Sequence, residues 1–273
     1  MVFDAKWRAV QRETQLAATL IARGVTALGN ASHATPGLYA EAFFGLSIGL
    51  ERVGKLIYIA DFAMANAGRF PTDDDLRKIG HDVESLIKEC EAVASKLDAN
   101  RLFATKPNDQ IHDAIVRVLS EFGKRTRYYN LRYLAGAAGG IDDPIAMWWS
   151  VVAQPILAKH YTLKKRSRDI ARAGSLESVL GPISTVMHSD EMGNPINSIA
   201  DLFGRAEATR VVQKYGRLYV LQIVRWLGSM VNTLALSGYH RDTPFLLGLD
   251  DAFDVFMNDD AYLRDRKTWS PYN

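Results

Sequence analysis

The chain contains few of the residues that characterise secreted, fibrous or disordered proteins. Its 273 residues include 1 cysteine, 9 prolines and 20 glycines. A single cysteine, Cys90, cannot form an internal disulfide framework, and its isolation is typical of a reducing compartment. With 48% hydrophobic and 23% charged residues, the composition excludes collagen-like and disordered chains.

Excess charge and long apolar runs are also absent. The net charge is +2, so any attraction to nucleic acid must come from a local patch. The two most apolar stretches, 38–59 and 218–236, both contain charged residues, which are costly at the centre of a bilayer. The N-terminal residues are charged and lack the apolar segment of a signal peptide. We therefore expect a cytoplasmic protein without a membrane partner.

Apolar residues recur at three- and four-residue intervals through the first half of the chain, a spacing that places them on one face of an α-helix. Four such stripes cover residues 7–28, 39–57, 76–97 and 111–122. Thr72 or Asp73 is suited to cap the third helix. The pattern predicts an all-α fold in which an up-and-down four-helix bundle spans about residues 4–124.

Residues 1–135 are therefore predicted to form a helical bundle, and residues 136–273 a further helical region that is either separate or continuous with it. The glycine-rich stretch 136–140 is expected to be a hinge or tight connection. The first helix of the second half is expected to run to about Arg172 and to bend at Pro155. That helix is expected to begin at Asp143-Pro144, and later helices at Asn194-Pro195, about Arg205 and Thr243-Pro244.

Candidate catalytic residues are few. No residues in the sequence have the spacing of a metal-binding motif, and there is no nucleophile motif or phosphate-binding loop. We therefore expect no metal and no cofactor. His81 lies off the apolar stripe and shares the polar face of the expected third helix with Arg77. Such a pair could supply a general base and a phosphate clamp. The alternative is a solvent-exposed histidine paired with an acid.

A basic and aromatic segment follows the fourth stripe. Mixed guanidinium groups and aromatic rings can neutralise phosphates while stacking on unpaired bases. The alternative is a loop whose tyrosines pack on the bundle and whose arginines are solvated. A second cationic group, Lys164, Arg168 and Arg172, is expected near a helix end, as solvated surface or as a further patch. The candidate nucleic-acid-binding residues are Arg125, Arg127, Tyr128, Tyr129 and Arg132.

Two short sequences resemble a known superfamily. Gly-Leu-Glu-Arg-Val-Gly-Lys-Leu-Ile at 49–57 and Arg-Lys-Ile-Gly-His-Asp at 77–82 resemble the HEPN superfamily over residues 36–95, with the second sequence expected on a helix. HEPN domains are helical bundles common in prokaryotic defence and toxin–antitoxin systems. Many dimerise, and many are metal-independent ribonucleases. The resemblance implies a homodimer that binds RNA, a nucleotide or a partner protein.

The spacing of the candidate pair departs from the superfamily. Nuclease members separate their arginine and histidine by four to six residues, whereas three residues lie between Arg77 and His81. We therefore expect a non-catalytic, HEPN-like interaction protein of a prokaryotic defence or stress system. The alternatives are a metal-independent endoribonuclease that uses Arg77 and His81, and a purely structural helical adaptor.

Overall fold

The computed structural model describes residues 5–137, 142–239, 243 and 246–271. Within these ranges the chain is all-α apart from one two-residue hairpin, which confirms the predicted fold class. The helices are α1 (Ala5–Leu28), α2 (Gly37–Ala65), α3 (Asp73–Ile79), α4 (Val83–Ala94), α5 (Gln110–Lys124), α6 (Tyr129–Leu134), α7 (Pro144–Trp148), α8 (Gln154–His160), α9 (Leu163–Leu180), α10 (Ile199–Tyr239) and α11 (Asp260–Asp265). The strands are β1 (His188–Ser189) and β2 (Pro195–Ile196), which pair antiparallel. The short 3₁₀ turns are Ala99–Arg101, Thr126–Tyr128, Gly181–Ile183 and Asp251–Phe256.

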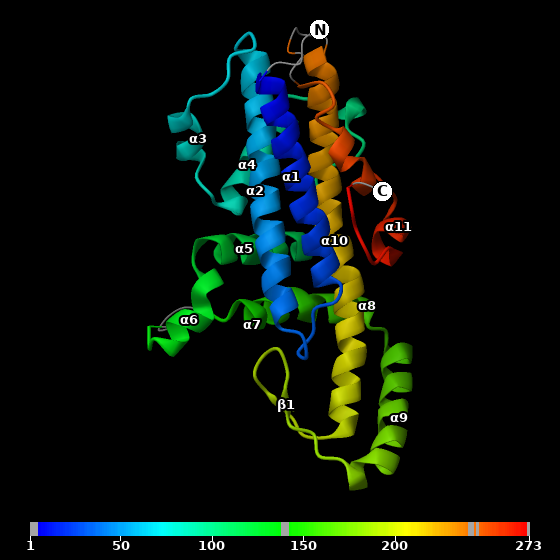
Figure 1. Cartoon of the computed structure of the whole chain (residues 1–273). Coiled ribbons are helices and arrows are strands. Elements are labelled where there is room, and N and C mark those ends of the chain that lie inside the picture. Colours follow the sequence, from blue (N-terminus) through cyan, green and yellow to red (C-terminus); the bar gives the residue numbers. More distant parts are fainter. Residues whose placement is uncertain (1–4, 138–141, 240–242, 244–245, 272–273) are drawn as a thin grey trace.

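Three long helices, α1, α2 and α10, form the body of the molecule (Figure 1). Helices α1 and α2 approach closely because glycines lie where they cross. A Cβ atom on Gly45 would lie 2.7 Å from the carbonyl oxygen of Leu20, and one on Gly49 would lie 2.6 Å from Cγ1 of Ile21. Side chains at these two positions would push the helices apart.

The hydrophobic core joins the two halves of the chain. Ile21 and Phe43 from the first half and Trp148 and Leu221 from the second belong to one cluster of buried side chains. Cys90 is 1% exposed and belongs to the same cluster, as its place on the apolar stripe predicts.

The third stripe does not form one helix. Its apolar positions divide between α3 and α4, and Gly80 between them has a φ of +73°, a backbone region that other residues rarely adopt. Thr72 caps α3 in a capping box with Asp75, and Asp82 caps α4. The expectation that Gly80-His81-Asp82 is helical is therefore wrong.

The first four stripes are not arranged as four long rods. Figure 1 shows α5 and α7 lying across the direction of α1 and α2. The helix that runs beside both α1 and α2 is α10. The up-and-down four-helix bundle expected over residues 4–124 is therefore not confirmed in its details.

In the second half of the chain, some helix boundaries lie where the sequence predicts them and others do not. Asp143 accepts a hydrogen bond from the backbone N–H of Ile145 and Pro144 is the first helical residue, as predicted. The helix continues through a π-helical stretch, Trp149–Ala153, which ends two residues before Pro155, consistent with a ring that lacks an N–H donor. It ends at His160 instead of continuing to Arg172, because Thr162 caps the separate helix α9.

The sequence predicts three later helix starts, at Asn194-Pro195, about Arg205 and Thr243-Pro244. Pro195 lies in β2, so the short helix expected there is wrong. The long helix α10 is confirmed and begins at Ile199, before the expected Arg205. Of the expected hinge at 136–140, residues 138–140 lie outside the described residues, as does Pro244 of the helix start expected at Thr243-Pro244.

Candidate functional site

His81 lies on the link between α3 and α4, with 82% of its side chain exposed. Its Nδ1 atom is 2.7 Å from Oε1 of Glu51 on α2, and the Nζ of Lys55 is 2.9 Å from the same oxygen. A carboxylate only accepts hydrogen bonds, so Nδ1 of His81 is the donor. In the neutral ring Nε2 then carries the free lone pair and faces solvent. The exposed histidine paired with an acid, one of the two sequence-based interpretations, is confirmed.

Arg77 is separated from this pair. It lies on α3 with 74% of its side chain exposed, and its guanidinium is 2.7 Å from Asp73 one turn earlier. The expectation that Arg77 and His81 share one helical face is wrong, because the chain leaves the helix at Gly80. Among the described contacts, none joins Arg77 to His81.

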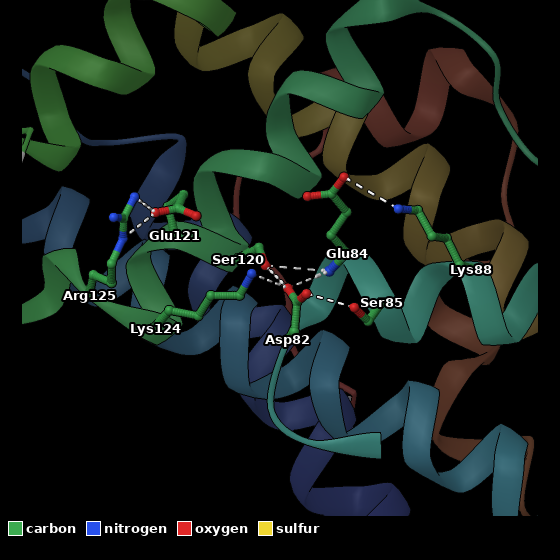
Figure 2. Close-up of polar contacts among 8 residues, drawn as sticks. All are labelled: Asp82, Glu84, Ser85, Lys88, Ser120, Glu121, Lys124 and Arg125. Carbon is green, nitrogen blue, oxygen red and sulfur yellow. Dashed lines mark hydrogen bonds and ion pairs between the residues drawn. The ribbon is translucent and has the colours of Figure 1, made fainter. Parts of the chain in front are cut away.

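The position of His81 is fixed by the residue that follows it. Figure 2 shows the Asp82 carboxylate between α4 and α5. It accepts hydrogen bonds from the hydroxyls of Ser85 (2.7 Å) and Ser120, and it lies 2.9 Å from Nζ of Lys124. Burial alone would raise the pKa of Asp82, but these hydrogen bonds and the Lys124 charge hold that pKa well below its usual range.

A surface hollow of about 410 Å³ joins His81 to the basic segment. Arg127 lines the hollow together with His81 and Lys124, so the structure brings a candidate catalytic residue beside a candidate nucleic-acid-binding residue. Lys124 is paired with Asp82, whereas the guanidinium of Arg127 lies 5.0 Å from the ring of Tyr128 and has no carboxylate partner among the described residues. The other lining residues are Phe44, Ser47, Ile48, Glu51, Val83, Phe122 and Gly123.

The basic and aromatic segment forms a 3₁₀ turn followed by the short helix α6. Tyr128 is 50% exposed and Tyr133 65% exposed, so these two tyrosines do not pack on the body of the protein. Arg132 is exposed as well. The rings of Tyr129 and Tyr133 lie 6.1 Å apart. The segment therefore presents rings and cations to solvent.

Arg125 differs from the rest of the segment. Its Nε is 2.7 Å from Oε2 of Glu121, one turn earlier on α5 (Figure 2). Because this carboxylate already neutralises the guanidinium, Arg125 is less suited than Arg127 to bind a phosphate.

The second cationic group lies at a different end of its helix from the one expected. Helix α9 begins at Leu163, so Lys164 is in its first turn, where the helix dipole disfavours cations. Arg168 lies near Asp169, with Nε 3.4 Å from Oδ1, and Arg172 is exposed. Stabilisation by the C-terminal end of the helix dipole is therefore excluded for this group.

Sequence patterns missed the partners of His81. The Glu51–Lys55 pair is visible as an acid and a base one turn apart, but nothing in the sequence assigns Glu51 to a histidine thirty residues later. Lys124 was likewise not selected, because its role depends on the contact between α4 and α5.

A polar cleft between α5, α8 and α10 was missed entirely. The Nε2 of His160 is 3.0 Å from the hydroxyl of Tyr219, and the Nε2 of His112 is 2.8 Å from Oε1 of Gln222. Burial lowers the pKa of both imidazoles. These residues come from distant parts of the sequence, and no short motif could have predicted their contact.

Comparison with known protein families, with curated proteins and with solved structures gives no match. None of the described helices combines the length and apolar character needed to cross a membrane. Within the described parts of the chain, no group of three or more histidine, cysteine or acidic side chains is arranged to hold a metal ion. The residues around His81 and on α6 therefore form the candidate functional site.

Proposed function

We propose that this protein is a HEPN-like helical interaction protein that binds single-stranded RNA across the hollow at His81 and along residues 125–133. One observation carries this proposal: Arg127 lines the same hollow as His81, while Tyr128 and Tyr133 of the same segment are exposed and Tyr129 is half-buried. Arg127 thus links the hollow at His81 to the aromatic segment, since its guanidinium lies 5.0 Å from the ring of Tyr128.

The chemistry of the surface favours unpaired bases. An exposed tyrosine ring offers a stacking platform worth about 1–3 kcal/mol per base. Arg127 is the strongest candidate for a phosphate, because its charge is not neutralised by a carboxylate among the described residues. Arg132, five residues further along the chain, is exposed and adds a second cation. A paired RNA helix would hide the base faces that the tyrosines need.

The test is a salt series of RNA binding by the full chain. Fluorescence anisotropy would be measured with a labelled single-stranded 12-nucleotide RNA and with a duplex of the same sequence. Affinity for the single strand should exceed that for the duplex and should fall steeply with salt. Arg127→Glu should weaken binding and reduce the magnitude of the slope of log K against log salt by about one.

The matched control is Arg101→Glu, which makes the same charge change at a residue 61% exposed on a 3₁₀ turn that does not line the hollow. It should leave the slope near that of the wild type. Equal losses in the two variants, or no binding by the wild type at low salt, would overturn the proposal. The latter result would favour a structural adaptor.

A second candidate function is metal-independent RNA cleavage, which the 2.7 Å contact between Glu51 and His81 favours. His81 Nε2 would take the proton of a 2′-hydroxyl, the 2′-oxygen would attack phosphorus, and the 5′-oxygen would leave and take a proton from water. Arg127 and Lys124 would stabilise the developing charge. Arg77, paired with Asp73, would have no such role.

Cleavage is tested in EDTA with purified wild type, His81→Ala, Arg127→Ala and Arg77→Ala. This mechanism predicts 2′,3′-cyclic phosphate ends, loss of cleavage in the first two variants and retention in the third. Loss in Arg77→Ala but not in Arg127→Ala would instead support the sequence-based pair. The absence of cleavage by wild type would leave RNA binding as the function.

The HEPN resemblance also leads us to propose a homodimer that acts in the cytoplasm within a prokaryotic defence or stress system. The resemblance at 49–57 and 77–82 supports this, together with the exposed Leu131 and Leu134 of α6. Light scattering tests the oligomeric state directly. A monomer at high micromolar concentration would contradict the dimer.

A further inference from the structure

Helix α9 carries a concentration of cations that the proposed RNA surface does not use. Among its 18 residues are five lysines and arginines but only two acids. Lys164 lies in the first turn, where the helix dipole disfavours a cation. The stability of α9 therefore does not account for these charges. The five cations are Lys164, Lys165, Arg166, Arg168 and Arg172.

Both acids of α9 are engaged on the side that packs against α10. Asp169 is 1% exposed and accepts a hydrogen bond of 3.0 Å from the hydroxyl of Tyr161, while Arg168 lies with Nε 3.4 Å from its other oxygen. Glu177 accepts a hydrogen bond of 2.9 Å from the backbone N–H of Ala200, at the start of α10. Neither carboxylate is left to neutralise the other cations of the helix.

Three of the cations form an outward basic face. Lys164, Arg168 and Arg172 lie four residues apart, so they share one side of α9, and all three are exposed. None of them lines the hollow between α9 and α10, whereas Asp190 and Asp201 do. Among the described contacts, no carboxylate pairs with Lys164 or Arg172. We call these three cations the basic face of α9.

Exposed aliphatic side chains lie at the end of α9 and just beyond it. Val179 is 69% exposed, Ile183 is 80% exposed and Met187 is 86% exposed. Val179 is four residues before Ile183, which ends the 3₁₀ turn Gly181–Ile183. Figure 1 shows α9 and the first part of α10 extending beyond α1 and α2, with this turn at that end of the molecule. We call the three side chains the apolar tip.

The composition of this region favours anionic lipid over RNA. No aromatic residue occurs in the sequence between 163 and 187, so the region has no ring on which an unpaired base could stack. Lysine and arginine beside exposed aliphatic side chains match a bilayer surface instead, because cations bind anionic headgroups and aliphatic groups enter the boundary of the acyl chains.

A second copy of the chain fits the region poorly. In a symmetric dimer the same patch meets itself. The basic face of one α9 would then lie close to the basic face of the other, and like charges in contact oppose association. Charge complementarity therefore also favours an anionic surface over this chain itself.

We propose that the basic face of α9 and the apolar tip together bind the surface of a membrane that contains anionic lipids. The cations supply the attraction to the headgroups, and Val179, Ile183 and Met187 insert at the acyl boundary. This site is separate from the hollow at His81, since none of its residues lines that hollow.

Surface binding differs from a membrane-spanning role. The expected absence of a membrane partner rests on charged residues within the apolar stretches 38–59 and 218–236, which argue against spanning segments alone. A peripheral protein needs no such segment. The cytoplasmic leaflet carries anionic lipids, so the proposal agrees with a cytoplasmic protein.

Cosedimentation of the full chain with lipid vesicles tests the proposal. One set of vesicles contains phosphatidylcholine only, and the other contains phosphatidylcholine and phosphatidylserine in a two-to-one ratio. The wild type should bind the phosphatidylserine vesicles at least about tenfold more tightly, and added salt should weaken this binding.

A matched pair of charge reversals tests the place of binding. Arg172 and Arg8 are both exposed, and each has another arginine four residues away, Arg168 and Arg12 respectively. Arg172→Glu should weaken binding to phosphatidylserine vesicles about tenfold or more, while Arg8→Glu, on α1, should change it by less than about twofold. Affinity for single-stranded RNA should be nearly the same in both variants.

A second pair tests the insertion of the tip. Ile183→Ser should weaken vesicle binding at least about fivefold, because it removes an aliphatic group from the acyl boundary. The control is Leu236→Ser, at a residue 55% exposed near the other end of α10, and it should bind as the wild type does. Arg127→Glu should also bind vesicles as the wild type does, so the RNA proposal can fail without this one.

Five results would overturn the proposal. Three concern the vesicles: no binding of the wild type to phosphatidylserine vesicles, equal binding to the two sets, and equal losses in Arg172→Glu and Arg8→Glu. A fall in RNA affinity in Arg172→Glu without vesicle binding would assign the basic face to RNA. A wild-type dimer that Ile183→Ser dissociates in light scattering would assign the tip to a second copy of the chain.

Discussion

Glu51 on α2 holds the imidazole of His81, with Oε1 2.7 Å from Nδ1, although His81 lies outside any helix and thirty residues further along the chain. The carboxylate is mostly buried, with 19% of its side chain exposed, whereas 82% of the histidine side chain is exposed. A largely fixed acid therefore orients a ring whose other nitrogen faces solvent.

Replacement of Glu51 should separate the proposed RNA binding from the proposed RNA cleavage. Glu51→Gln removes a negative charge from a hollow that also contains Lys124 and Arg127. RNA affinity at low salt should therefore rise by about twofold to fivefold, since a charge pair a few ångströms apart in water is worth about 1 kcal/mol or less. If His81 is a general base, cleavage should fall at least tenfold, because a neutral amide still accepts a hydrogen bond from Nδ1 but no longer stabilises the imidazolium that forms when the ring takes a proton. Anisotropy and a cleavage assay on the same samples measure both effects, and a fall in affinity would contradict this electrostatic account.

Asp82 should make the link between α3 and α4 sensitive to acid. Its folded-state pKa is lowered from an ordinary value of 3.8, so its contribution to stability is present above that value and is lost as the pH falls through the folded pKa. Asp82→Asn should reduce the free energy of unfolding by about 2 kcal/mol at pH 7. The difference between wild type and variant should shrink below about pH 4. Urea unfolding at several pH values measures it.

The control for this prediction is Asp98→Asn. Asp98 also caps a short helix, accepting a hydrogen bond of 3.0 Å from the backbone of Asn100, but it has neither the serine hydroxyls nor the close lysine of Asp82. Its substitution should cost less than that of Asp82. A loss for Asp82→Asn that stayed constant down to pH 2 would show that the charge of Asp82 contributes nothing.

Substitution by alanine should have opposite effects on stability at two glycines. Gly80 has φ +73° and ψ −155° with no atom near its Cβ position, so Gly80→Ala should destabilise the protein by about 1–3 kcal/mol through backbone strain alone. Gly123 lies within α5 and also has open space at its Cβ position, so Gly123→Ala should stabilise by about 0.5–1 kcal/mol. Thermal unfolding of both variants checks the pair. A stabilising Gly80→Ala would mean that the chain is helical through this link.

Cys90 should be inert in the folded protein. Its side chain is 1% exposed. Burial is the main cause that raises the pKa of its thiol to about 12, and the charges of Glu89 and Glu91 add to this effect. The thiolate is the reactive form, so modification by a disulfide reagent at pH 8 should be slow in buffer and rapid in denaturant. Rapid, stoichiometric reaction without denaturant would contradict the burial of this side chain.

The helical character of the chain could be predicted from periodicity alone. The stripes at 7–28 and 39–57 became α1 and α2, and the buried position of Cys90 followed from its place on a stripe. The caps at Thr72 and Asp143 were also predictable, because capping depends on residues within one turn.

The break at Gly80 could not be predicted in this way. Ile79, Val83 and Leu86 continue the three- and four-residue spacing across it, so the apolar pattern is the same for one helix or two. What stabilises two helices is Asp82, whose carboxylate caps α4 and also binds Ser120 and Lys124 on α5. That contact exists only once α5 is in place.

The order and type of residues thus determined that this protein is all-α and where most of its helices lie, and they singled out the side chains for which we propose RNA binding. Tertiary structure alone decided that His81 meets Glu51 and shares a hollow with Arg127, and that Arg77 does not join them. The physical reason is that periodicity and capping are local, whereas contacts between helices depend on how their buried faces pack. A one-dimensional pattern specifies each face but not its neighbour.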